Sequence, residues 1–323
     1  MIMGILRAWR ALPAALAALA WMAPRDARAC GSCRGPGGAG AALTAPWQKY
    51  GVSVVETLRL GHGIFDQRSR YRAFGDESHD RVLELGFAGA VRPIDAIELG
   101  ATVAYGNVLV GGPSFRSARG ALGDVSVRAR WEVHGEPPIA YTGETRWPSL
   151  GLTLTTRLPT GTVDRTTSAG AAGPSPGTVG STATSQGLGT TELALAVDVR
   201  KSFGTRFQVG AVGEGAWRAP DRSIGLRRAL APRGLVRVMG IVFERDATFG
   251  LFADLAVEGD VSYGSRTSPA SGQRSFSLGA SATYKTELGL RSGLSLSYQP
   301  PIDGLSMNAV AATAITTFLA FTR

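Results

Sequence analysis

Few side chains in this sequence have the types and spacing that catalysis requires. His62, His79 and His134 are scattered along the chain, and isolated histidines are more often surface residues than metal ligands or general bases. The string Gly173-Pro-Ser-Pro-Gly177 has the spacing of a hydrolase nucleophile elbow, but such an elbow needs a strand-to-helix turn, whereas this serine lies between two prolines. No phosphate loop, dinucleotide fingerprint or zinc motif is present. The sequence therefore predicts a protein that is not an enzyme and that needs no cofactor.

The two cysteines, Cys30 and Cys33, have C-x-x-C spacing. In an exported chain such a pair most often forms a small local disulfide, which is the pairing we predict. Two thiolates do not complete a metal site, and no histidine follows Cys33, which excludes covalent haem attachment. Acylation of Cys30 is left open, although Arg28 is unfavourable in a lipoprotein signal.

The N-terminus has the features of a secretory signal. Arg7 and Arg10 precede a short apolar stretch over residues 11–23, and Ala27-Arg-Ala29 provides an A-x-A cleavage site. We therefore predict a signal peptide over residues 1–29, a flexible Cys-containing segment over 30–50, and a folded domain over 51–323. The stretch is too short to be a spanning helix.

The charged residues of the folded domain follow a period of two. Between residues 122 and 134, valine, alanine and tryptophan occupy the odd positions from 125 to 133, and mostly charged or polar residues occupy the even ones. Successive side chains of a strand point to opposite faces, so this pattern predicts one apolar and one polar face. We predict twelve such segments, at residues 51–61, 80–91, 96–109, 121–134, 149–160, 189–202, 205–218, 232–244, 248–262, 274–286, 291–299 and 308–322.

The connections between these segments alternate in length. Those at 92–95, 203–204, 245–247 and 287–290 are short turns, whereas those at 62–79, 110–120, 161–188, 219–231 and 263–273 are long. Long strands with short turns at one end and long loops at the other predict an up-and-down antiparallel transmembrane β-barrel, with both termini at the periplasmic, short-turn end. The connection over 135–148 is longer than this pattern allows. A soluble periplasmic β-protein is the alternative fold.

Composition limits the other function classes. No window holds 18 consecutive apolar residues, which excludes a bundle of membrane helices. The net charge of +9 comes from dispersed basic residues without aromatic interleaving, so we predict no nucleic-acid partner. We expect the excess arginine in the lumen and the loops.

A charge facing lipid near the membrane midplane is costly, so the polar face of each strand should line the lumen. The weakest segment is the first, where Val54-Val-Glu56 breaks the alternation and predicts a bulge. Aromatic residues near strand ends, Phe318 and Phe321 among them, are candidates for an interfacial girdle. The predicted lining residues are Glu84, Glu98, Asp124, Arg128, Arg130, Glu132, Arg157, Glu192, Asp198, Arg200, Glu214, Arg237, Asp254 and Glu258.

Three stretches resemble a known family. They are the Gly-Asp strand from Leu122, the strand ending in Leu158-Pro-Thr-Gly161, and the strand opened by Gly187-Leu-Gly189 after a Gly-rich loop. Together they resemble the outer-membrane barrel family described as "MetA-pathway of phenol degradation", over about residues 80–322. The resemblance implies a barrel in the outer membrane of a Gram-negative bacterium and a role in the uptake of small solutes, aromatic or hydrophobic compounds among them.

Two functions remain open at this point. An open lumen with charged residues predicts a passive channel for small solutes. A lumen filled by paired charges predicts a structural or surface-binding barrel that acts through its long loops, and a twelve-strand barrel lies between the filled and the aqueous sizes. A barrel enzyme acting on lipid is disfavoured by the missing Ser/His arrangement. Membrane lipid and small solutes are the expected partners, and the oligomeric state is not defined by the sequence.

Overall fold

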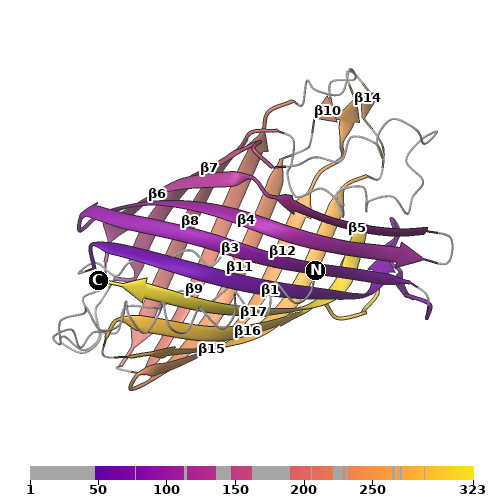
Figure 1. Cartoon of the computed structure of the whole chain (residues 1–323). Coiled ribbons are helices and arrows are strands. Elements are labelled where there is room, and N and C mark those ends of the chain that lie inside the picture. The colour runs from indigo at the N-terminus through magenta and orange to yellow at the C-terminus, as the bar shows by residue number, and fades with distance from the viewer. Residues whose placement is uncertain are drawn as a thin grey trace.

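The computed structural model describes residues 48–323 except 77, 113–114, 136–146, 162–189, 205, 221–227, 230–231, 264–265, 268, 270 and 287 (Figure 1). Twelve strands form a closed antiparallel barrel, as predicted. They are β1 (Tyr50–Phe65), β3 (His79–Ile94), β4 (Ile97–Gly112), β6 (Val125–His134), β7 (Ser149–Leu158), β8 (Glu192–Phe203), β9 (Phe207–Arg218), β11 (Arg233–Glu244), β12 (Ala247–Glu258), β15 (Gln273–Lys285), β16 (Leu290–Tyr298) and β17 (Ala309–Thr322). No helix in the described part of the chain is long and apolar enough to cross a membrane.

The barrel closes between its first and last strands. β1 pairs with β17 from Gly51 opposite Thr322 to Phe65 opposite Ala309. Each of the other barrel strands pairs with the barrel strands that precede and follow it in the sequence. The backbone N–H of Lys49 also donates to the carbonyl oxygen of Arg323 at 2.6 Å, so the two ends of the described chain meet at the short-turn end. An even strand number requires this arrangement.

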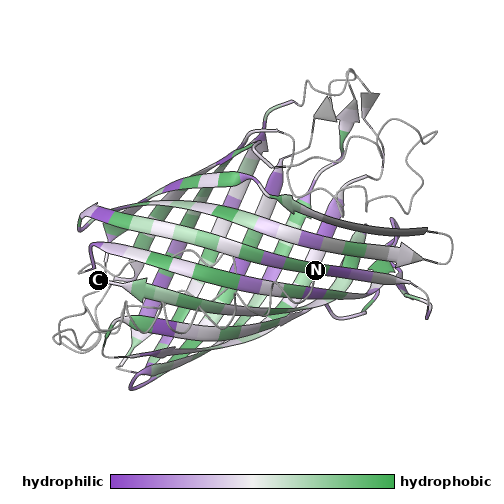
Figure 2. Ribbon diagram, viewed as in Figure 1, coloured by the Kyte–Doolittle hydropathy of each residue, from purple (hydrophilic) through white to green (hydrophobic). Residues whose placement is uncertain are grey.

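The period of two in the sequence separates the two faces of the wall. Large apolar side chains face outward and are exposed on the barrel exterior, including Leu251 (69%), Trp217 (56%) and Leu195 (54%). Residues between them face the lumen, and many of those are charged. Figure 2 shows the resulting alternation of hydrophobic and hydrophilic positions along the strands. The predicted face assignments are therefore confirmed for most strands.

Several segments predicted as loops extend the wall. β1 and β4 run past their predicted ends, and two short strands, β2 (Tyr71–Ala73) and β5 (Phe115–Leu122), pair with them. A break at residues 123–124 separates β5 from β6. Three further strands, β10 (Arg228–Ala229), β13 (Ser262–Tyr263) and β14 (Arg266–Thr267), form a small separate sheet at the long-loop end (Figure 1). Despite the long connection over 135–148, β6 pairs directly with β7, so the predicted strand count is correct.

The predicted bulge in the first strand was placed wrongly. The register of β1 against β17 is continuous through residues 54–56 and shifts instead between Gly61 and Gly63. Val55 therefore faces the lumen, and Glu56 faces outward between Thr317 and Leu85. Among the described strands, Glu56 is the one charged residue that faces outward away from a strand end.

The interfacial role predicted for Phe318 was also wrong. Phe318 lies opposite Gly293 on the lumen side, and a Cβ at Gly293 would lie 2.2 Å from the Phe318 ring. Phe252 likewise lies over Gly279, where a Cβ would lie 2.1 Å from the ring. Each ring is accommodated on the inner wall because the opposing residue has no side chain. Phe321, in contrast, faces outward and its ring lies 6.4 Å from that of Tyr50.

The long-loop end of the closing seam is held by a hydrogen-bonded connection. Residues 299–308, between β16 and β17, bond to the turn that follows β1. Gly304 donates its N–H to the carbonyl of Ser69 at 2.9 Å, and Asp303 accepts the N–H of Tyr71 at 2.6 Å. Within the turn, Asp66 accepts the N–H groups of Arg68 and Arg70 at 2.8 and 3.0 Å. The seam is thus reinforced beyond its strand pairing.

Candidate functional site

The lumen is the candidate site, because the barrel collects most of the predicted residues there. Of the fourteen predicted lining residues, all but Asp124 lie at inward positions of barrel strands. Asp124 precedes β6, and its carboxylate accepts the backbone N–H of Gly161 at 2.9 Å. Most of the inward charges form ion pairs, and these fall into groups.

The first group, the inner network, lies near the short-turn end on β3, β4, β6 and β8. Glu98 binds Arg92 at 3.4 Å and Arg128 at 3.3 Å, and the Glu98 and Arg92 side chains are each 1% exposed. Glu132 contacts both Arg92 and Arg130 and so connects this part to Asp198. Asp198 binds Arg130 at 2.9 Å and Arg200 at 3.1 Å. The members are Arg92, Glu98, Arg128, Arg130, Glu132, Asp198 and Arg200.

The second group, the outer network, lies at the long-loop end of β8, β9, β11 and β12. Arg218 bridges Glu192 and Glu258, each at 2.6 Å. Arg233 bridges Glu192 at 3.4 Å and Glu214 at 2.6 Å. Arg218 and Glu192 are buried, so these charges are covered by their neighbours rather than by water.

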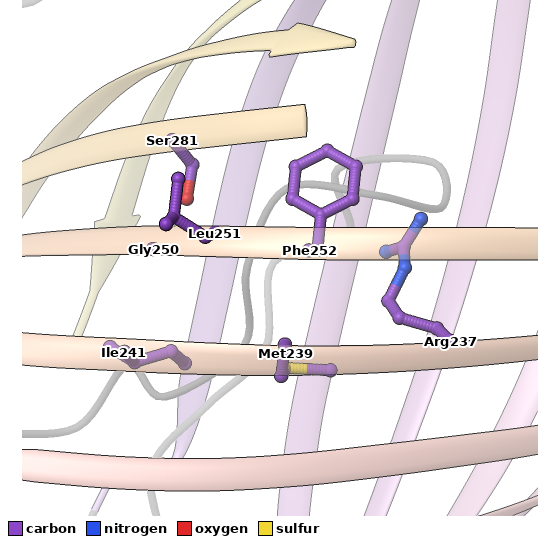
Figure 3. Close-up of a pocket in the computed structure, with 7 residues that line it drawn as sticks. All are labelled: Arg237, Met239, Ile241, Gly250, Leu251, Phe252 and Ser281. Carbon is purple, nitrogen blue, oxygen red and sulfur yellow. The ribbon is translucent and has the colours of Figure 1, made fainter. Parts of the chain in front are cut away.

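Next to the outer network, β11 and β12 carry a separate pair. The Nε and Nη2 atoms of Arg237 donate to the two carboxylate oxygens of Asp254 at 2.5 and 2.6 Å, and the guanidinium carbon lies 4.9 Å from the Phe252 ring centroid. Figure 3 shows a small recess at this point, lined by Arg237, Met239, Ile241, Gly250, Leu251, Phe252 and Ser281. An apolar ring, a thioether and a serine hydroxyl therefore lie next to a neutralised ion pair.

Sequence reasoning missed three members of these groups and a further pair. Arg92 lies beside a turn, Arg218 and Arg233 lie at strand ends, and alternation alone did not assign them to the lumen. Arg59 and Asp80 pair at 3.1 Å between β1 and β3, in stretches taken for a weak strand and a strand end. If every second residue had been assigned to the lumen up to the last residue of each strand, all five would have been found.

Two predicted lining residues remain unpaired. Within the described ranges, Glu84 of β3 and Arg157 of β7 have no ion pair or side-chain hydrogen bond. Glu84 is exposed inside the barrel and Arg157 is half-buried. The other predicted residues in the strands are all engaged with an opposite charge.

The other side of the lumen is formed by four of the twelve strands, β15, β16, β17 and β1, and it is lined mainly by hydroxyls and small residues. The Thr57 and Thr316 hydroxyls lie 3.1 Å apart across the closing seam. Apart from Arg59, Arg291 and Lys285, the inward positions of these strands carry no charge. We call this surface the hydroxyl wall; it includes Ser53, Thr57, Ser275, Ser277, Ser281, Thr283, Ser295, Ser297, Thr316 and Thr322.

The histidines are not assembled into a site. His62 lies at the bulge of β1, where its Nδ1 is 3.1 Å from the Tyr71 hydroxyl and its ring is 5.5 Å from that of Tyr298. Burial, together with Tyr298, raises the pKa of Tyr71 above its usual range. His134 ends β6, and His79 begins β3. No group of three or more metal-binding side chains occurs in the described ranges. Cys30, Cys33 and Ser175 lie outside them.

This fold has a counterpart among solved structures. The chain resembles the COG4313 outer membrane channel of Pseudomonas putida F1, with a TM-score of 0.68, 14% identity, and coverage of 89% of this chain and 99% of that one. The two proteins share a barrel fold.

More distant structures include the NanC porin, with a TM-score of 0.46, 9% identity, and coverage of 84% of this chain and 98% of that one. They also include the TodX deltaS2S3 mutant monoaromatic hydrocarbon channel, with a TM-score of 0.46, 7% identity, and coverage of 88% of this chain and 93% of that one. These scores are too low to support an argument. No family model matches the chain, and no curated protein does.

Proposed function

We propose that this protein is a passive channel for small solutes in the outer membrane of a Gram-negative bacterium, exported by the signal over residues 1–29. The observation that supports this proposal is a closed barrel with an apolar exterior and a lumen in which four adjacent strands present hydroxyls, several of them half-buried, in place of interlocked charges. Such an exterior matches lipid, and such a lumen offers water and polar solutes a surface with which to hydrogen-bond. The fold shared with an outer membrane channel supports the same function.

Aromatic or hydrophobic compounds are among the proposed solutes. The resemblance to the phenol-degradation barrel family suggests this class, and the Phe252 ring and the Met239 thioether on the inner wall offer such a solute an apolar contact. The contribution of aromatic contacts beyond buried area is about 0.5–1.5 kcal/mol, which favours brief residence rather than tight binding.

The second candidate function is a closed barrel that binds partners through its long loops. The inner and outer networks favour it, because interlocked Arg–carboxylate pairs fill space along β3 to β12. The hydroxyl wall argues for the channel, since no such network crosses that side in the described residues.

Solute flux into liposomes distinguishes the two functions. The refolded protein, verified by heat-modifiable migration on a gel, is reconstituted and tested with sugars, organic acids and phenols of increasing size. A channel gives swelling that depends on solute size or class. A folded barrel that admits none of these solutes would contradict the channel and favour the closed barrel.

A further inference from the structure

The inward charges of the barrel are nearly balanced, although the chain carries a net charge of +9. The basic excess expected in the lumen is small in its described part, where eleven bases face nine carboxylates, so most of the surplus basic charge lies elsewhere. The inward carboxylates are Asp80, Glu84, Glu98, Glu132, Glu192, Asp198, Glu214, Asp254 and Glu258, and the inward bases are Arg59, Arg92, Arg128, Arg130, Arg157, Arg200, Arg218, Arg233, Arg237, Lys285 and Arg291.

These charges are also neutralised locally. Every inward carboxylate except Glu84 lies within 4.0 Å of an arginine nitrogen, and the pairing carboxylates are at most 22% exposed. Rings of like charge select ions in pores because they present a net potential to the solute. Paired charges present mainly dipoles, so they give little preference for either sign of ion.

The hydroxyl wall is the better surface for a moving solute. Its Ser275, Ser277, Ser281 and Thr316 side chains are half-buried and reachable from the lumen. A hydroxyl both donates and accepts, so it can replace the water that a neutral polar solute loses. It cannot supply the counter-charge that a partly dehydrated ion requires, and that deficit is costly.

We infer that the barrel selects small uncharged solutes that carry hydrogen-bonding groups, and that these move along the hydroxyl wall. This inference rests on the proposed channel function and names its substrate class. The charged side of the lumen disfavours ions because most of its charges are paired, with Glu84 and Arg157 as the exceptions. The hydroxyl wall hydrates the neutral solute in passage. The recess at Phe252 lies at the edge of the hydroxyl wall, on β12 beside Ser281 of β15 (Figure 3).

The first test compares three solutes of nearly equal size: lactamide, lactate and 1-amino-2-propanol, which are neutral, anionic and cationic at pH 7. Liposome swelling with lactamide should be faster than with either ion by about tenfold, the equivalent of roughly 1.4 kcal/mol. In planar bilayers under a KCl gradient, the reversal potential should lie near zero. Faster flux of either ion, or a strong preference for K⁺ or Cl⁻, would overturn the inference.

The second test changes the wall without changing its shape. Thr57→Val and Thr316→Val remove one hydroxyl each and should slow lactamide severalfold while leaving KCl conductance unchanged. Thr155→Val is the matched control, since Thr155 lies on β7 on the charged side and should leave lactamide flux unchanged. Equal effects at all three positions would contradict a path along the hydroxyl wall.

The third test creates free charge in the lumen. Asp254→Asn leaves Arg237 without its partner and should shift the reversal potential towards anion preference, whereas Arg237→Gln should shift it towards cation preference. Opposite shifts support the claim that pairing neutralises this lumen, and unchanged potentials from conducting variants contradict it. Absence of any flux or conductance from the folded wild-type barrel overturns the channel itself, whereas conduction with ion preference overturns only the selectivity.

Discussion

At the scale of single residues, the barrel places its charges by a simple rule with one exception. Most inward charges are paired and in several cases buried, as Glu98 and Arg92 are, and outward charges are confined to strand ends except at Glu56. A buried ion pair adds little net stability, but removal of one partner leaves a buried charge uncompensated. Individual residues in the lumen should therefore differ greatly in their sensitivity to substitution.

Glu98→Gln tests this sensitivity. Glu98 neutralises both Arg92 and Arg128, so its loss should lower the free energy of unfolding by about 3 kcal/mol. Urea titration of the refolded barrel in vesicles measures the change. Asp95→Asn is the control, because its pair with Lys49 is exposed and should contribute less than about 1 kcal/mol. Equal effects at the two positions would contradict a buried network.

Glu56→Leu tests the exception. A carboxylate facing lipid near mid-membrane is unfavourable, though less so than the roughly 2–4 kcal/mol for Arg or Lys, so leucine should stabilise the barrel by about 1 kcal/mol. Urea titration in vesicles measures this change in the free energy of unfolding. Glu84→Leu, at an exposed position inside the lumen, should not stabilise. A destabilised Glu56→Leu variant would instead show that the carboxylate has a favourable partner.

At the scale of elements, two glycines decide where aromatic rings fit on the inner wall. Gly279→Ala would place a Cβ 2.1 Å from the Phe252 ring and 2.7 Å from the carbonyl oxygen of Leu296, which should destabilise the barrel by about 1–3 kcal/mol. At Gly213 a Cβ meets nothing within 4 Å, so Gly213→Ala should be neutral or slightly stabilising. Thermal unfolding of both variants measures the difference, and matching midpoints would show that Phe252 can move aside.

The turn after β1 should respond to acid. The N–H of Arg70, followed by that of Arg68, holds the pKa of Asp66 below its ordinary value of 3.8. Because the folded pKa is the lower one, the stabilisation is present above pH 4 and is lost as the pH falls through the folded pKa. The protection factor of the Arg70 amide, which is the unprotected exchange rate divided by the observed rate at the same pH, should therefore fall in acid, and Asp66→Asn should show low protection already at neutral pH. Slow exchange in that variant would mean that the seam connection alone holds the turn.

At the scale of the whole molecule, the closed barrel depends on pairing between residues far apart in the sequence. In a background with Cys30 and Cys33 changed to serine, Thr57→Cys combined with Thr316→Cys should form a disulfide, since the two native hydroxyls lie 3.1 Å apart. The oxidised, denatured chain should migrate faster on a non-reducing gel. Thr57→Cys with Thr153→Cys, on β7, is the control and should not cross-link. Failure of the first pair to oxidise would contradict closure by β1 and β17.

Much of this architecture could be predicted from the sequence, because alternation of large apolar and charged residues directly marks the two faces of a strand. Alternation did not predict the faces correctly where the residues on the two faces of a strand have similar polarity. β17 carries alanine and threonine on both faces, so Phe318 could not be assigned to the lumen, and β1 carries adjacent valines, so its bulge was misplaced. Ion-pair partners such as Glu192 and Arg218 depend on register between strands, which a single sequence does not contain.

The closing seam also concentrates the kinetic difficulty of folding at one place. Neighbouring strands meet by closing hairpins, which have low contact order, whereas β1 and β17 meet only after some 260 intervening residues are arranged. Folding rates fall as the sequence separation of native contacts grows, and loop-closure entropy must be lost before such contacts form. Barrel closure is then the slow, late event. The connection over residues 299–308 acts at that step, because its hydrogen bonds to the turn after β1 stabilise the chain once β1 and β17 have paired.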